Sequence, residues 1–543
     1  MKTLRVLGTL LVTLLLAGGC QKADPAEGKM IFRYNESAGV TTLDPAYSKN
    51  QSLNWVCTQL YNGLVQLDHN LEPQPAIAKH WKISEDGRTY TFVLRDDVYF
   101  HKNKLFGTPD STRKVVAEDF VYSLGRILDP KVASPGLWIF NEVEPGGFVS
   151  LNDSVLQIRL KHPFSPFLGL LSMPYCSVVP REIAEYYGED FGRHPCGTGP
   201  FFFRMWKEGV KLVLRRNELY FEHDEAGVRM PYLDAVAVTF IIDRQTAFLE
   251  FVKGNLDFMN SLDASYKDEV LTRTGQLKAK YANRLDMVSV PFLNTEYLGF
   301  KMDKEDSPLR DKRVRQAVNM GFDRVKMMKY LRNGIGTPGI YGFIPKGLPG
   351  FDTAGHIGYG YDPARASQLL EEAGYPHGQG LPTLTLSTTA NYLDLCKYIQ
   401  QQLELVGIPV KVEVSPPAAL SEQVAQGKSS WFRKSWIADY PDAENYLSLF
   451  FSGNFSPDGP NYTHFSNPLY DELFLRSRQC SDDVKRTELY RQMDSILMQE
   501  APVVVLYYDQ ILHFTHKGVS GLQNNALNGL DLRRVKIEKH HAE

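Results

Sequence analysis

The sequence is poor in the features that mark several classes of protein. Only six of its 543 residues are cysteine, and 60 basic residues nearly balance 63 acidic ones, for a net charge of −3. This balance provides no excess of positive charge to attract nucleic acid, so we expect no nucleic-acid partner. Beyond the N-terminal region, no apolar run is long enough to form a transmembrane helix.

Motifs for metal binding and nucleophilic catalysis are also lacking. There is no H-E-x-x-H and no G-x-S-x-G, and the cysteines do not have metal-ligand spacing. His513 and His516 lie three apart in a strand-like stretch, which would point them to opposite faces. We therefore expect no metal, no cofactor and no enzymatic activity. The weakest alternative is an extracytoplasmic hydrolase that uses Asp439, Asp442 and Glu444, although no third catalytic group accompanies these carboxylates.

The first residues are typical of an export signal. Two basic residues precede the apolar stretch 6–16, and Ala17-Gly-Gly-Cys20 follows it. The apolar stretch is too short to span a bilayer, and small residues directly before a cysteine resemble a bacterial lipoprotein signal. We expect a signal peptide at 1–19, lipidation of Cys20 and a polar tether over 20–29. The protein would then be anchored to the membrane of the bacterial cell envelope and face the periplasm; the alternative is an ordinary signal peptide with an incidental cysteine.

The remaining cysteines are odd in number, so at least one thiol is free. They are Cys57, Cys176, Cys196, Cys396 and Cys480. Cys176 and Cys196 flank one segment, and we predict a disulfide between them, although their spacing alone does not establish it.

The length and the pattern of elements predict more than one domain. A chain of 543 residues is too long for one ordinary core and implies two or three domains. After Pro291, strands alternate with helices as in an α/β lobe. Strands are predicted at 31–34, 88–95, 151–160, 210–214, 235–242, 410–414 and 501–508. Helices are predicted at 53–64, 118–128, 313–331 and 395–403, with another that Asp362-Pro363 opens and Gly374 closes.

The most distinctive stretch, residues 433–442, places a guanidinium, an indole and two carboxylates within ten residues. If it is extended, Arg433 and Ser435 lie on one face and Trp436 on the other. The following Pro–Asp turn presents Asp439 at an open end. An aromatic ring beside an unpaired carboxylate suits a ligand with an apolar body and a cationic head. The alternative is an exposed strand end whose aspartate caps a helix starting near Asp442.

Short motifs follow one another in a fixed order along most of the chain. They are Leu43-Asp44-Pro45, 60–68, 83–95, 117–123, 197–201, 254–257, 311–317, Asp323-Arg324 and 436–440. Together they resemble the solute-binding proteins of peptide ABC transporters, the oligopeptide- and dipeptide-binding family (family 5).

The resemblance implies an α/β fold with two lobes, the class II periplasmic-binding-protein-like fold with an extra subdomain in the first lobe. Lobe I would comprise residues 30–290 and include the subdomain, at about 76–192. Lobe II would comprise 291–500, and residues 501–543 would return to lobe I. Hinges near 290 and 500 would let the lobes close over cargo.

The resemblance also implies roles for individual residues. In peptide-binding members, the aspartate of the Trp-x-x-Asp pattern holds the α-ammonium of the peptide, and here that residue is Asp439. Trp436 would flank a side-chain pocket, and Arg433 would lie near the bound peptide. The further ligand contacts implied are Gln51, Asn260, Ser261 and Tyr297. The alternative for each of these is packing within a lobe.

One position departs from the pattern. Gly136 follows Ser134-Pro135 where some relatives have a contact tyrosine. We expect Trp138 to compensate for the missing ring, so the shape of the pocket differs there.

The function implied is that of a lipid-anchored solute-binding protein that captures short peptides and delivers them to an ABC transporter permease. It would act without chemistry of its own, and we expect a monomer. The same fold in relatives carries other cargo, so a metal chelate, haem or an oligosaccharide is the alternative ligand.

Overall fold

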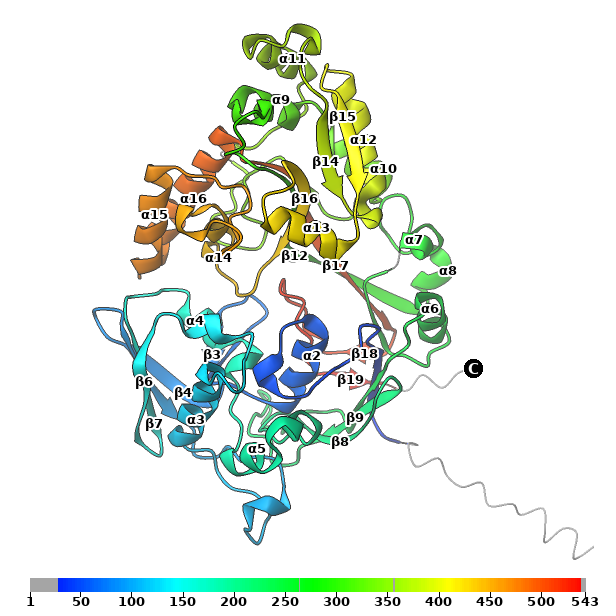
Figure 1. Cartoon of the computed structure of the whole chain (residues 1–543). Helices are drawn as coiled ribbons and strands as arrows, with labels where there is room; N and C mark the ends of the chain where they lie inside the picture. The colour runs from blue at the N-terminus through cyan, green and yellow to red at the C-terminus, as the bar shows by residue number, and fades with distance from the viewer. Residues whose placement is uncertain (1–27, 263, 355–356, 539–543) are drawn as a thin grey trace, which may run out of the picture.

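The computed structural model describes residues 28–262, 264–354 and 357–538. Figure 1 shows two lobes, the lower one built from the blue to green part of the chain and the upper one from the green to orange part. The last long strand then runs back from the upper lobe into the lower one. This arrangement is the α/β two-lobed fold that the sequence predicts.

The strands are β1 (Ile31–Asn35), β2 (Val65–Leu67), β3 (Pro73–Pro75), β4 (Ala78–Ile83), β5 (Thr89–Leu94), β6 (Val143–Asn152), β7 (Val155–Leu160), β8 (Phe201–Lys207), β9 (Lys211–Arg216), β10 (Ala235–Thr239), β11 (Phe258–Asn260), β12 (Leu285–Phe300), β13 (Thr337–Pro338), β14 (Leu384–Thr388), β15 (Val410–Val414), β16 (Trp431–Ile437), β17 (Val503–His516), β18 (Val519–Ser520) and β19 (Lys536–Ile537). The α-helices are α2 (Gln51–Leu60), α3 (Ala117–Leu128), α4 (Phe167–Leu171), α5 (Arg181–Tyr187), α6 (Arg244–Val252), α7 (Ala264–Val270), α8 (Ala279–Ala282), α9 (Lys312–Met320), α10 (Arg324–Leu331), α11 (Pro363–Glu372), α12 (Leu393–Glu404), α13 (Pro417–Ala425), α14 (Glu444–Leu447), α15 (Pro468–Gln479) and α16 (Asp483–Glu500).

One large sheet extends through both lobes, in the strand order β15-β14-β16-β12-β17-β11-β1-β10-β9-β8. Its two long central strands, β12 and β17, pair antiparallel along their length. The register shifts between Pro291 and Thr295, so three residues of β12 lie opposite Asp509 alone. Such a bulge bends the paired strands. The irregular point of this strand pair therefore lies next to the predicted lobe boundary near residue 290.

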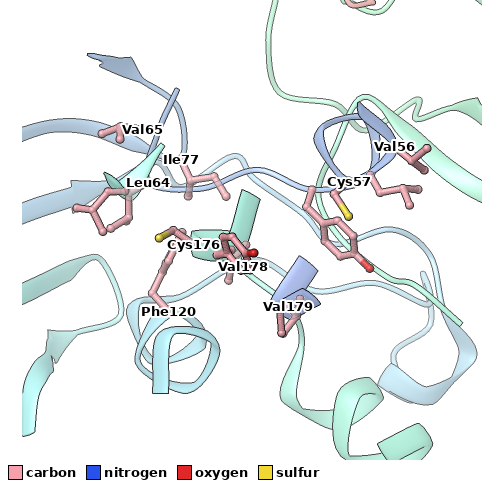
Figure 2. Packing of buried hydrophobic residues seen from close by; sticks show 14 of the residues in the cluster. Val56, Cys57, Leu64, Val65, Ile77, Phe120, Cys176, Val178 and Val179 are labelled. Carbon is pink, nitrogen blue, oxygen red and sulfur yellow. The ribbon is translucent and has the colours of Figure 1, made fainter. Parts of the chain in front are cut away.

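A separate four-stranded sheet, in the order β4-β5-β7-β6, lies within lobe I. The alternation predicted for β5 is confirmed, because Tyr90, Phe92 and Leu94 are buried while their neighbours are less so. Helix α3 packs against β6 and β7, and Figure 2 shows its Phe120 among the buried side chains of the lobe I core.

Two predicted elements are divided in the structure. The helix expected over 313–331 is two helices, because Gly321 ends α9 and the Asp323 side chain accepts the N–H of Lys326 to begin α10. A Cβ at Gly321 would lie 2.6 Å from Leu403 of α12, so the close packing of the two segments requires glycine there. The strand expected over 151–160 is divided by the turn at 153–154 between β6 and β7.

The predicted disulfide is wrong. Cys176 and Cys196 are both free and buried, and their thiols donate to different carbonyls, those of Leu170 and His101. Figure 2 shows Cys176 in the lobe I core, apart from Cys57 of α2. Burial raises the pKa of the Cys57 thiol to about 12 and also raises the pKa of the Cys176 thiol. Both cysteines therefore behave as small apolar side chains.

The predicted signal, lipidation site and start of the tether lie outside the described residues. Within the part of the chain that the structure describes, no helix combines the length and apolar character needed to cross a membrane.

Candidate functional site

Strand β16 confirms the extended conformation predicted for residues 433–436. It pairs with β12 from Trp431 to Ile437. On its other edge, β16 meets β14 at a single position, where Phe432 pairs with Ser387. Among the described residues, no strand pairs with that edge from Lys434 to Ile437. This part of β16 therefore offers unpaired N–H and C=O groups to an extended chain.

A tight turn follows β16 and carries Asp439. The N–H of Ala438 donates to the carbonyl of Leu293 at 2.9 Å, which ties the turn to the bulge of β12. The side chain of Asn445 orients Trp436 and Asp439. Its Oδ1 accepts from Trp436 Nε1 (2.9 Å) and from the N–H of Asp439 (3.1 Å). Its Nδ2 donates to Asp439 Oδ2 (3.4 Å). One amide thus fixes both the indole and the carboxylate of the Trp-x-x-Asp pattern.

The Asp439 carboxylate has no countercharge among the residues described. It forms no ion pair with a lysine, arginine or histidine there, and its one side-chain partner is the amide of Asn445. Although the residue as a whole is exposed, the surrounding protein desolvates its carboxyl group and raises its pKa, an effect that the hydrogen bond from Asn445 opposes. A partly desolvated carboxylate without a cation is stabilised by a ligand that brings one.

The contacts of Tyr440 and Pro441, which directly follow Asp439, show that the turn lies where the two lobes meet. Tyr440 belongs to the hydrophobic cluster of lobe I, and its ring centroid lies 6.1 Å from that of Trp138. A Cβ at Gly169 of α4 would lie 3.5 Å from Cδ of Pro441, an ordinary van der Waals distance, so α4 passes close to the proline ring. Trp138, predicted as a ligand contact, is 37% exposed and stands at this interface.

A cavity of about 530 Å³ adjoins the same turn. Lobe I contributes Tyr90 and Phe164 to its walls, and lobe II contributes Pro441, Asp442 and Tyr490. Asp442 also accepts the N–H of Glu444, the first residue of α14, although the N-cap position itself is Ala443. The lobes consequently leave space between them beside the turn that carries Asp439.

Arg433 lies on the other face of β16 from Trp436, as predicted. Its guanidinium forms an ion pair with Glu296 of β12 and lies 3.2 Å from the ring centroid of Tyr392. The side chains of Arg433 and Glu296 are only 10% and 2% exposed. Burial raises the pKa of Glu296, and the charge of Arg433 opposes this rise. In this structure the guanidinium is thus engaged within lobe II, and its contact with a ligand stays a prediction.

The remaining predicted contacts lie elsewhere. Tyr297 is 2% exposed, with its ring edge-on to that of Phe343. Gln51 Nε2 donates to the carbonyl of Asn528 (3.1 Å), and Asn260 pairs with His513 in the sheet. Ser261 follows in a left-handed conformation with φ of 67°. The structure records no contact between these four residues and Asp439 within the described ranges, so their roles stay predictions.

Two residues of the site were missed by the sequence prediction. Asn445 lies six residues beyond Asp439, and an amide at the start of a helix was a usable signal for it. Tyr175 gave no signal, because only the fold brings it near enough for the charge of Asp439 to add to the rise that burial causes in its pKa. A Cβ at Gly136 would lie only 2.5 Å from Cδ1 of Tyr175, so the tyrosine ring occupies the space beside this glycine.

Comparisons with known proteins identify the family of the chain. Residues 72–458 match the family described as "Bacterial extracellular solute-binding proteins, family 5 Middle". The chain is 27% identical over 488 residues to the glutathione-binding protein GsiB of Salmonella typhi, covering 89% of each chain, and 26% identical over 551 residues to di/tripeptide-binding protein 2 of Pseudomonas aeruginosa, covering 97% of this chain and 98% of the other.

Among solved structures, HbpA2 from Haemophilus parasuis has the same fold, with a TM-score of 0.82, 24% identity, and coverage of 94% of this chain and all of that one. The region that matches the family, residues 72–458, includes most of both lobes and the whole stretch from Arg433 to Asp442. The chain therefore belongs to the bacterial extracellular solute-binding proteins, family 5.

Proposed function

We propose that this protein captures short peptides with a free N-terminus between its two lobes and delivers them to an ABC transporter permease. One observation carries the proposal: Asp439, a carboxylate without a countercharge among the described residues, stands where the lobes meet and directly follows a strand with an open edge. An ammonium supplies the missing charge, and an extended backbone supplies partners for the strand.

The pairing with Asp439 and the main-chain hydrogen bonds to β16 recognise different parts of the peptide. The α-ammonium pairs with Asp439 and fixes the end of the peptide. The peptide backbone then runs along the open edge of β16 and is held by main-chain hydrogen bonds, which do not depend on the side chains of the peptide. Trp436 lies next to this path, with its indole held by Asn445. The binding step requires no chemical conversion.

The ligands named for two relatives support a peptide as cargo. One binds glutathione and another binds di- and tripeptides. Glutathione is itself a small peptide with a free ammonium, so both names fit a site that neutralises an amino end. Attachment of the protein to the membrane through Cys20 belongs to the same proposal, because an anchored receptor stays close to its permease.

The test compares Asp439→Asn with Asp458→Asn, a matched change at an exposed aspartate of lobe II. Calorimetry with a tripeptide should show the affinity of Asp439→Asn reduced about thirtyfold or more, since removing one partner of a desolvated charge pair costs about 2–5 kcal/mol. Asp458→Asn should bind as the wild type does.

The same tripeptide with an acetylated N-terminus should bind weakly to the wild type and lose nothing further in Asp439→Asn. Equal affinity of Asp439→Asn and the wild type for the free peptide would refute the role of Asp439. Mass spectrometry of ligand that copurifies with the protein gives an independent check, and a sugar, haem or metal chelate there would replace the peptide as cargo.

A further inference from the structure

Two segments at one end of the four-stranded sheet in lobe I contact a helix end of lobe II. Glu142 directly precedes β6, and Phe164 and Ser165 follow β7. Since β6 and β7 pair antiparallel, these residues leave the sheet at the same end. They meet the last turn of α15, which contains Arg478 and is followed by Cys480.

The side chain of Arg478 is the centre of this contact. Its Nη2 donates to Oε1 of Glu142 at 3.0 Å, and its guanidinium carbon lies 4.7 Å from the ring centroid of Phe164. Within lobe II, its Nε lies 3.3 Å from Oε1 of Glu444, an ion pair without an aligned hydrogen bond. The side chains of Arg478, Glu142 and Glu444 are 28%, 21% and 5% exposed, so the three charges are largely shielded from water.

The backbone at the end of α15 adds two hydrogen bonds between the lobes. The last carbonyls of a helix have no partner within the helix. Here the carbonyl of Arg478 accepts the N–H of Ser165 at 3.2 Å, and the carbonyl of Cys480 accepts the hydroxyl of Ser165 at 2.7 Å. A serine of lobe I therefore caps the end of a lobe II helix.

Glu444 connects this contact to the turn that carries Asp439. One of its carboxylate oxygens pairs with Arg478, and the other accepts from the hydroxyl of Tyr440, which directly follows Asp439. The contact also borders the cavity between the lobes, because Ser165 is part of the cavity wall. None of the residues that form the contact is among the predicted ligand contacts, so the contact does not depend on the identity of the cargo.

We propose that Arg478 forms a latch with Glu142 and Ser165 of lobe I, which stabilises the closed arrangement of the lobes in the ligand-free protein as well as in the ligand-bound one. When the lobes separate, Arg478 keeps Glu444 as its partner, because both belong to lobe II. Only the contacts with lobe I are then lost. Bound cargo leaves after the latch has opened, so the latch slows its release. The proposed function concerns what is bound, whereas the latch determines how long it stays.

Small-angle X-ray scattering of the ligand-free protein tests the latch. Burial raises the pKa of Glu444 to about 7, and the charge of Arg478 opposes this rise, so the measurement is made at pH 8, where the carboxylate is ionised. Arg478→Gln should increase the radius of gyration relative to the wild type. Arg476→Gln is the matched control, because Arg476 lies in the same helical turn but pairs with Glu472 at the exposed surface, and it should leave the radius unchanged.

A double-mutant cycle shows whether the effect belongs to the pair between the lobes. Glu142→Gln should increase the radius of gyration as Arg478→Gln does, and the double variant should exceed Arg478→Gln by little, since both changes remove the same bond. Ser165→Ala leaves every charge in place and removes the hydroxyl that Cys480 accepts. It should also increase the radius, and it tests the latch separately if a charge variant does not fold.

Stopped-flow release of trialanine provides a second measurement. Its dissociation rate should rise about fivefold in Arg478→Gln, because a hydrogen bond between charged groups is lost from the closed arrangement, and should keep the wild-type value in Arg476→Gln. An unchanged radius of gyration in Arg478→Gln or Glu142→Gln, or a cycle in which the two effects simply add, would overturn the latch. A wild type that does not bind trialanine would contradict the proposed function, whereas the scattering of the ligand-free variants still decides the inference.

Discussion

Removal of the Arg433 guanidinium by Arg433→Met is a sharp test of what holds lobe II together. Glu296 is 2% exposed, and Arg433 is its cationic partner. Without that partner the carboxylate keeps only neutral contacts, with Asn294 Nδ2 at 3.2 Å and the hydroxyl of Tyr392 at 3.4 Å. The variant therefore leaves the Glu296 carboxylate in the interior without its direct cationic partner, and Arg332 is the cation whose charge still interacts with it.

The expected cost follows from that burial. Breaking a buried ion pair on one side typically costs about 3–5 kcal/mol, because the remaining charge stays desolvated. For a lobe of this size, such a loss lowers the melting temperature by roughly 6–20 °C. Arg433→Met combined with Glu296→Gln should recover most of the loss, since no unpaired charge then remains.

The pH dependence has a definite sign. In Arg433→Met, burial raises the pKa of Glu296 without the opposing effect of the arginine, so the folded protein holds a proton that the unfolded chain releases. The penalty is absent below the ordinary glutamate pKa of about 4.3 and grows as the pH rises above it, until the raised pKa is passed. The single variant should thus differ from the wild type more at pH 7 than at pH 4.

The assay is thermal or denaturant unfolding of the wild type, the single variant and the double variant. Arg365→Met is the matched control, because Arg365 and Glu372 form an exposed pair of lobe II that should contribute less than about 1 kcal/mol. A loss in Arg433→Met no larger than in Arg365→Met would refute the reasoning. Peptide affinity of the double variant tests the ligand role of Arg433 separately: affinity that stays low after stability recovers would support a direct contact.

Two further predictions concern lobe I. Burial lowers the pKa of His101 to about 4, so its contribution to stability is complete above about pH 6.5 and is lost as the pH falls towards 4, by about 3 kcal/mol in all. Denaturant unfolding of His101→Gln should show a flatter pH dependence over that range, and an unchanged slope would contradict the prediction. Leu71, in the loop between β2 and β3, is buried in a hydrophobic cluster of lobe II. Leu71→Ala should weaken lobe closure by about 2 kcal/mol and increase the dissociation rate of bound peptide in stopped-flow experiments; Leu137→Ala, at an exposed leucine, is the control, and equal rates in the two variants would exclude this role of Leu71.

Local patterns in the sequence were sufficient for much of the fold. The two-residue alternation of β5 and the capping residues of α11, with Asp362 before it and Gly374 after it, depend on interactions within a few residues of the chain. The extended conformation of β16 and its opposed faces were predictable for the same reason. The order of short motifs then indicated the family, which the comparison with known proteins confirms.

The details of the site were decided by the tertiary structure. Glu296 reaches Arg433 from 137 residues away, and Gly136 and Tyr175 meet although neither lies in the Trp-x-x-Asp stretch. The break between α9 and α10 depends on Leu403 of another helix, and the two cysteines expected to pair lie in separate surroundings. The sequence thus determined most of the elements, the two-lobed class and the acidic residue at the end of β16. Which groups face that acid, and which charges are already neutralised, depends on contacts between distant segments, and these exist only once the lobes have folded and packed against each other.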